Sequence, residues 1–149
     1  MSGLLLVSSL LFAGARAFGA QAADSLAMKA LSICASGEER DFELFFREHL
    51  DTEAIKAAPP GMRAFNLTRL CRATGGFKIS ARSAEASYQA SLDANELPGF
   101  HANLTLEMDA DGKIARFSLR PIPGYNGVVM SPNDAVKALN RLFGDAAAR

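Results

Sequence analysis

The amino-acid sequence predicts an α+β fold, in which grouped helices pack on a four-stranded antiparallel sheet. Its strongest signal is the stretch from Phe100 to Met108, where apolar and polar residues alternate strictly, as they do on the two faces of a half-buried strand. A turn sequence ends at Gly112 and a second alternating stretch runs to Arg120, so this region predicts a β-hairpin. In the segments that precede the predicted strands, apolar residues recur at the spacing of an α-helix. Helices grouped beside consecutive strands indicate the α+β class.

Three helical segments are expected before the strands. Asp24 or Ser25 can cap the first, which should end near Ser36. The second is expected over residues 38–50, with acidic residues in its first turn and an apolar stripe of phenylalanines. Residues 51–58 can add a further helical turn, and a third helix is expected over residues 62–73. Gly75 and Gly76 then end the helical region.

Four short strands should follow and form an antiparallel meander, because strands joined closely in sequence usually pair. They are expected at residues 77–82, 86–92 and 100–108, with a return strand that ends at Arg120. After this hairpin, residues 124–149 form a linker and a last helix, which Ser131 can cap and in which Val136 and Leu139 begin an apolar stripe. The residues expected on the inner face of the sheet are Phe77, Ile79, Ala81, Ala86, Tyr88, Ala90, Leu92, Leu104, Leu106, Ala115, Phe117 and Leu119.

Composition narrows the class of protein. The chain has 149 residues, of which 49% are hydrophobic, and this suits one small domain with a single core. Its formal net charge is zero, with 16 basic and 16 acidic residues. Proteins that bind nucleic acid usually carry a basic excess, so no nucleic-acid partner is expected.

Residues 1–22 have the character of a cleavable signal peptide. The apolar run from Leu4 to Phe12 is too short to span a membrane. Small residues follow it, and the triplets 15–17 and 20–22 both fit the small-x-small pattern of a cleavage site. Residues 1–3 lack the usual positive charge, so the alternative is a buried N-terminal helix. From the short apolar run and the cleavage patterns, we expect a soluble periplasmic or secreted protein with no membrane span in its mature chain.

The two cysteines, Cys34 and Cys71, fall on the apolar stripes of different helices. In an oxidising compartment they can form a disulfide that stabilises the fold by about 3–4 kcal/mol. The alternative is two buried free thiols. No CxxC or closely spaced histidine pattern occurs, so a metal site and a catalytic cysteine are not expected.

The remaining polar candidates have ordinary structural explanations beside the functional ones. His49 follows two phenylalanines and should border the core, whereas His101 lies on the polar face of its strand. Arg116 and Arg120 should face Glu107 or Thr105 across the hairpin, either as cross-strand pairs or as a patch for an acidic ligand. No nucleophile elbow, Ser-x-x-Lys motif or phosphate-binding loop is present.

The chain resembles the small NTF2-like (SnoaL/DUF3887-type) domains of exported bacterial proteins, which often precede a serine hydrolase or peptidase domain. The matching stretches are residues 34–38, 42–50, 75–77 and 112–121, and the likeness covers residues 26–123. It implies an NTF2-like domain over residues 24–123, a cystatin-like cone in which a curved sheet wraps the helices, with a possible pocket at its mouth. Catalytic members place Asp, His or Tyr inside the cone. Here the inner face is apolar, with Tyr88 as the polar-tipped exception.

These observations lead to the expectation of a non-catalytic domain that binds a small apolar ligand or a protein partner. The candidate ligand-binding residues are Tyr88, His101, Arg63 and Arg116, and no cofactor is expected. One alternative is an isomerase- or hydrolase-type enzyme that uses Tyr88 with His101 or Arg63. Another is a homodimeric scaffold that pairs through the sheet. Convergence of Tyr88 with a His, Asp or Arg in one deep pocket would favour the enzyme.

Overall fold

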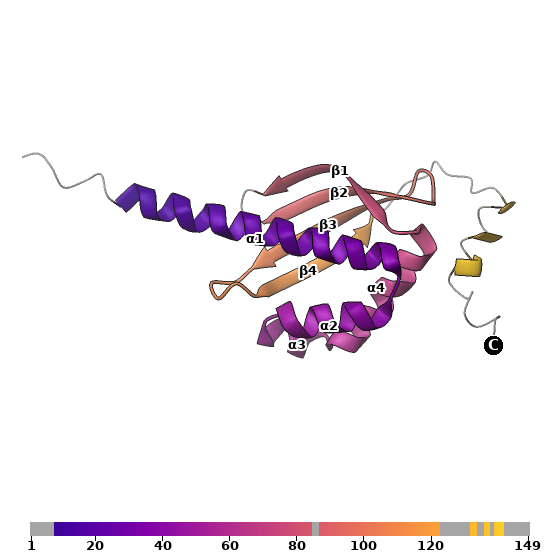
Figure 1. Cartoon of the computed structure of the whole chain (residues 1–149), viewed down its shortest axis with the longest axis horizontal. Helices are drawn as coiled ribbons and strands as arrows, with labels where there is room; N and C mark the ends of the chain where they lie inside the picture. The colour runs from indigo at the N-terminus through magenta and orange to yellow at the C-terminus, as the bar shows by residue number, and fades with distance from the viewer. Residues whose placement is uncertain (1–7, 85–86, 123–131, 134–135, 138, 142–149) are drawn as a thin grey trace, which may run out of the picture.

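The computed structural model shows helices followed by an antiparallel sheet (Figure 1). It describes residues 8–84, 87–122, 132–133, 136–137 and 139–141, and for residues 8–18 and 84 the backbone alone. The α+β class is confirmed, as is the meander, whose strand order is β1-β2-β3-β4. The elements are α1 (Ser8–Ser36), α2 (Glu39–His49), α3 (Thr52–Ala57), α4 (Pro60–Thr74), β1 (Phe77–Ala84), β2 (Tyr88–Ala94), β3 (His101–Met108) and β4 (Ile114–Pro121).

The core lies between one face of the sheet and the helices. α1 contacts β1, β2 and β3, while α2 and α4 pack against each other and α3 contacts β4 (Figure 1). The largest buried side chains come from both layers: Phe42, Phe45 and Phe46 on α2, and Leu92, Leu104 and Leu106 on the sheet, each at most 2% exposed. The alternation predicted for β3 is confirmed, because Ala102, Leu104 and Leu106 are buried and the polar residues between them are not. The other face of the sheet carries polar side chains.

Two β-bulges change which side chains face the core. In β1 the register shifts between Ile79 and Ala81, so Ala81 is exposed and Arg82 takes the helix-facing side opposite Ala90. In β4 the shift places Ile114 fully inside, opposite Met108, and leaves Ala115 exposed. The predicted inner positions of Ala81 and Ala115 are therefore wrong. A bulge inserts one residue and reverses the alternation beyond it. Ala86 lies outside the described residues.

Helix α1 differs most from the expectation. It runs unbroken from Ser8, so Asp24 lies inside the helix and is not its cap. Residues 13–23 are rich in alanine and contain no proline, and alanine has the highest helix propensity. The other helices match closely: the expected extra turn is α3, capped by Asp51, whose carboxylate accepts a hydrogen bond from the Ala54 N–H at 2.7 Å. The described residues 132–133, 136–137 and 139–141 are helical, as predicted, but Val136 and Leu139 are each 53% exposed.

A disulfide and a glycine pair close the end of the helical layer. Cys34 on α1 is bonded to Cys71 on α4, which decides between the two expectations for the cysteines. Gly75 ends α4 in the left-handed conformation at φ 69°, as predicted for a helix C-terminus. Gly76 has φ 82°, and a Cβ there would lie 3.0 Å from the Cα of Ala35. The glycine at 76 therefore allows β1 to begin directly against the end of α1.

Candidate functional site

Tyr88 lies on the helix-facing side of β2 and is 2% exposed. Its hydroxyl is buried beside Asp24 and Arg82, close enough for both to influence its pKa, but neither contact has the geometry of a hydrogen bond. Burial raises the pKa of the phenol above 10.0, and the Asp24 carboxylate adds to the rise while Arg82 opposes it. Arg82 donates instead to Asp24, with 2.8 Å between Nη1 and Oδ1. Tyr88 thus has charged neighbours, but its hydroxyl is sealed from solvent.

His101 lies on the opposite, open face of the sheet. Its Nδ1 is 2.6 Å from the carboxylate of Asp93 on β2, and both side chains are one-third exposed. On the same face, Arg116 pairs with Glu107 at 3.5 Å, which confirms the cross-strand pair predicted for Arg116. Arg120 lies opposite Asn103, so the prediction that it faces Glu107 or Thr105 is wrong. The sheet itself therefore separates His101 and Arg116 from Tyr88. These residues do not converge on one site.

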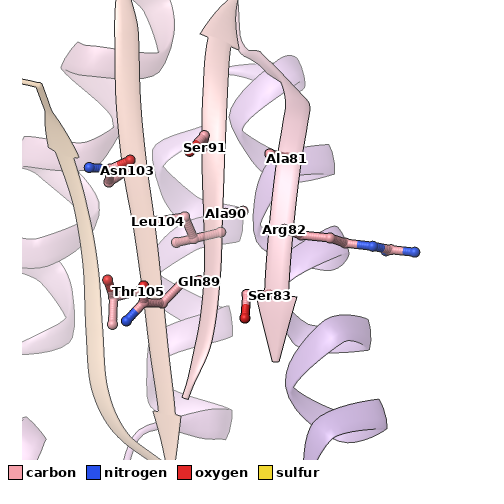
Figure 2. A pocket seen from close by; sticks show the side chains of 9 residues that line it. All are labelled: Ala81, Arg82, Ser83, Gln89, Ala90, Ser91, Asn103, Leu104 and Thr105. Carbon is pink, nitrogen blue, oxygen red and sulfur yellow. The ribbon is translucent and has the colours of Figure 1, made fainter. Parts of the chain in front are cut away.

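The open face also carries a shallow hollow of about 310 Å³ over β1, β2 and β3 (Figure 2). Figure 2 shows hydroxyl and amide side chains around it, from Ser83, Gln89, Ser91, Asn103 and Thr105. Arg82 also borders the hollow, but its guanidinium extends away from it toward the helix side. The lining residues include no carboxylate and no aromatic ring. This surface suits water or weak hydrogen-bonding contacts.

A second hollow, of about 240 Å³, lies between α4 and β4; we call it the α4–β4 groove. Its floor is apolar: Phe117 packs edge-on against Phe46, with ring centroids 5.2 Å apart, and Leu119 is only partly buried. Arg120 stands at the rim, exposed, and makes no hydrogen bond or ion pair with a described residue. The residues lining the groove are Phe46, Arg63, Asn66, Leu67, Leu70, Phe117, Ser118, Leu119 and Arg120.

Arg63 also lines this groove, but its guanidinium is occupied. Its Nε donates to the carbonyl of Ala58 at 2.9 Å, and its Nη2 donates to the carbonyl of Ala54 at 2.8 Å. The Ala58 carbonyl lies at the C-cap of α3, where helix acceptors lack intrahelical partners, whereas the Ala54 carbonyl also accepts from the Ala58 N–H at 3.2 Å. Arg63 is therefore a capping residue that closes one end of the groove. Of the four predicted site residues, it alone lines the α4–β4 groove.

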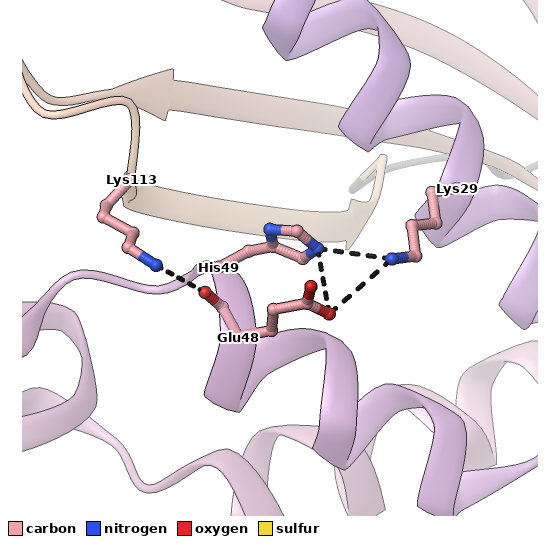
Figure 3. Close-up of polar contacts among 4 residues, drawn as sticks. All are labelled: Lys29, Glu48, His49 and Lys113. Carbon is pink, nitrogen blue, oxygen red and sulfur yellow. Dashed lines mark hydrogen bonds and ion pairs between the residues drawn. The ribbon is translucent and has the colours of Figure 1, made fainter.

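A polar cluster joins α1, α2 and the β3–β4 turn around His49 (Figure 3). Lys29 Nζ lies 3.3 Å from His49 Nε2 and 3.8 Å from Glu48 Oε2, and Lys113 donates to the Glu48 carbonyl at 2.7 Å. The imidazole packs against Phe45, with centroids 5.0 Å apart, so His49 borders the core as predicted. Burial lowers the pKa of His49 below 6.5, although Glu48 opposes this. The same Nε2 lies 3.5 Å from Glu48 Oε2, so it can accept from Lys29 when unprotonated or donate to Glu48 when protonated.

Two classes of site receive no support from the described part of the chain. There, no three His, Cys, Asp or Glu side chains are grouped so that they could hold a metal ion. Within the same residues, no helix is both long and apolar enough to cross a membrane. Of the two hollows described above, the α4–β4 groove is the one in which apolar surface and an available charge occur together. Sequence reasoning flagged Arg63 and Arg120 separately, but no sequence signal showed that they share a groove.

Comparisons with known proteins identified no relative of this chain. No protein-family model matches the chain, and searches of curated proteins and of solved structures found no match.

Proposed function

We propose that this protein is an exported, non-catalytic binding domain of the NTF2-like kind, and that it binds the apolar part of a ligand or partner in the α4–β4 groove. The observation that carries the proposal is the groove's combination of exposed apolar floor and unpaired charge. Phe117 and Leu119 are incompletely covered by the protein's own side chains, and Arg120 lacks a partner among the described residues. Ligand sites typically combine apolar walls with a few polar groups in this way.

A binding role is favoured over the enzyme alternative by the positions of the candidate side chains. Tyr88 and His101 lie on opposite faces of the sheet, and Arg63 is used to cap α3. A general acid or base must reach the reacting atom within hydrogen-bond distance. Tyr88, His101 and Arg63 therefore do not come together around one substrate.

Export is supported by where α1 begins to pack against the domain. Ala23 is 4% exposed and Asp24 pairs with Arg82, whereas Gln21 and Ala22 are exposed. Cleavage after the small-x-small triplet at 20–22 would remove the exposed Gln21 and Ala22 and keep the contacts of Ala23 and Asp24. N-terminal sequencing of protein from the exported fraction should begin at Ala23. A full-length chain retained in the cytoplasm would contradict export.

The groove can be tested with anilinonaphthalene sulfonate, which combines an apolar ring system with one negative charge. Saturable fluorescence enhancement is expected for the folded wild type. Leu119→Glu places a carboxylate in the groove and should weaken binding about tenfold or more. Thr105→Glu adds the same charge to the open face and should leave binding unchanged. Absence of saturable binding, or equal weakening by both substitutions, would contradict the groove as the site.

A further inference from the structure

We propose that the ligand of the α4–β4 groove is an extended acidic peptide, which adds to the edge of the sheet as a fifth strand beside β4. This inference rests on the proposed function, because it names the partner of the same groove. Strand addition of this kind needs three things: unpaired backbone groups on an edge strand, a pocket beside that edge for side chains, and a reason to prefer one composition. β4 has all three.

The first requirement, unpaired backbone groups on an edge strand, is met by β4. β4 is the last strand of the sheet, and β3 is the one strand that pairs with it among the described residues. The Ile122 N–H donates to the carbonyl of His101 at 3.0 Å, so the backbone groups of Ile122 face β3. Because these groups alternate in direction along a strand, those of Phe117 and Leu119 point away from the sheet. No described segment pairs with them.

One end of this edge already has such a pairing. Leu50 forms a parallel bridge with Ile114, and the Asp51 N–H donates to the Ile114 carbonyl at 2.9 Å. The chain then turns into α3 at Thr52 and leaves the rest of the edge. A bound strand would continue the hydrogen bonding that the protein's own segment begins. The unpaired stretch ends at Pro121, which has no N–H to offer.

The pocket lies on the correct side of this edge. Phe117 and Leu119 also point their side chains into the α4–β4 groove. Alternate side chains of an added strand would enter the same hollow, about 7 Å apart. Leu67 and Leu70 of α4 form its other wall, so apolar side chains are favoured at these peptide positions.

Charge decides the composition on the other side of the added strand. The intervening peptide side chains would lie on the open face beside Ser118 and Arg120. Arg116 is already paired with Glu107 at 3.5 Å, so Arg120 is the cation available for a peptide carboxylate. A second copy of β4 is a poor occupant, because antiparallel self-pairing centred on Ser118 would set Arg116 opposite Arg120, and like charges across strands are destabilising.

The test uses a fluorescein-labelled heptapeptide, Thr-Leu-Glu-Val-Glu-Leu-Thr, and fluorescence anisotropy. Saturable binding to the wild type is expected. A peptide with lysine in place of both glutamates should bind about tenfold more weakly. An N-methylated version, methylated at alternate residues on the edge-facing side, keeps the side chains but cannot pair with β4, so it should not bind. Unimpaired binding of the N-methylated peptide would overturn strand addition.

Protein variants complete the experiment. Arg120→Glu should lose the preference for the acidic peptide and favour the lysine version, whereas Arg116→Glu should have the smaller effect, because Arg116 is already paired. Equal effects would overturn the assignment of Arg120. Binding of anilinonaphthalene sulfonate without any peptide binding would overturn the peptide proposal and retain the groove. Absence of binding of both would overturn the proposed function as well.

Discussion

Arg82 and Asp24 form an ion pair at 2.8 Å that joins β1 to α1 across 58 positions of the chain. The pair depends on the bulge after Ile79, which turns Arg82 from the open face toward the helix. Both side chains are substantially exposed, at 58% and 40%, so the pair itself contributes little, typically less than about 1 kcal/mol. Its position matters more, because it lies over the buried hydroxyl of Tyr88.

Removal of the Tyr88 hydroxyl should be nearly neutral for stability at pH 7. The hydroxyl is buried without a hydrogen bond among the described residues, so Tyr88→Phe should change the free energy of unfolding by less than about 1 kcal/mol, or raise it. Tyr88→Ala should cost about 3 kcal/mol or more, because it empties a core position. Urea denaturation measures both. A large loss in the Phe variant would mean that the hydroxyl has a partner.

The Tyr88 phenol should also make the protein less stable at alkaline pH. Its pKa is raised in the fold above the usual 10.0, so above that pH the unfolded chain loses the proton first. The unfolded state then binds fewer protons, and the free energy of unfolding falls as pH rises. Tyr88→Phe should reduce this loss between pH 9 and 11. Identical pH profiles for the two proteins would contradict the prediction.

Loss of the Cys34–Cys71 disulfide should destabilise the domain by about 3–4 kcal/mol, because the bond joins residues 37 positions apart in the chain. The Cys34→Ala/Cys71→Ala double variant should unfold at lower urea concentration than the oxidised wild type. Reduced wild type is the matched control and should behave like the variant. A titration of the denatured, unreduced protein that finds two free thiols would contradict the bond.

Gly76 should be less replaceable than another glycine with the same backbone conformation. Gly76 and Gly112 have φ values of 82° and 77°, so alanine at either site is strained by about 1–2 kcal/mol. A Cβ at Gly76 would also lie 3.0 Å from the Ala35 backbone, whereas a Cβ at Gly112 would have no neighbouring atom within 4 Å. Gly76→Ala should therefore destabilise more than Gly112→Ala in thermal unfolding. Equal losses of stability in the two variants would show that the backbone conformation, and not the contact with Ala35, sets the cost of the alanine.

His49 should make the protein less stable in mild acid. Its pKa is lowered below 6.5 in the fold, mainly by burial, with Lys29 and Lys113 adding to the effect and Glu48 opposing it. Below pH 6.5 the unfolded state therefore binds more protons than the folded state, so the free energy of unfolding falls as pH falls. His49→Gln should flatten this dependence between pH 7 and 5. An unchanged slope would assign the acid sensitivity to other groups.

Much of the fold could be predicted because its signals are local. The alternation in β3 and the phenylalanine spacing in α2 each report which side of one element is buried, and the structure agrees at both. The errors at Ala81 and Ala115 arose at bulges, where one inserted residue reverses the pattern. The site was less predictable. Tyr88 and His101 both appeared suitable, but whether two side chains share a face depends on the pairing of separate strands.

The sequence by itself determined most of the secondary structure, the α+β class and the balance of charge, because each depends on neighbouring residues or on composition. It did not determine whether Cys34 and Cys71 are bonded, the occupied guanidinium of Arg63 or the groove between α4 and β4. Only the tertiary structure decided these, since each requires residues from separate elements to meet. The free edge of β4 is the clearest case: its sequence resembles that of any strand, and the packing of the other elements leaves its outer side unpaired.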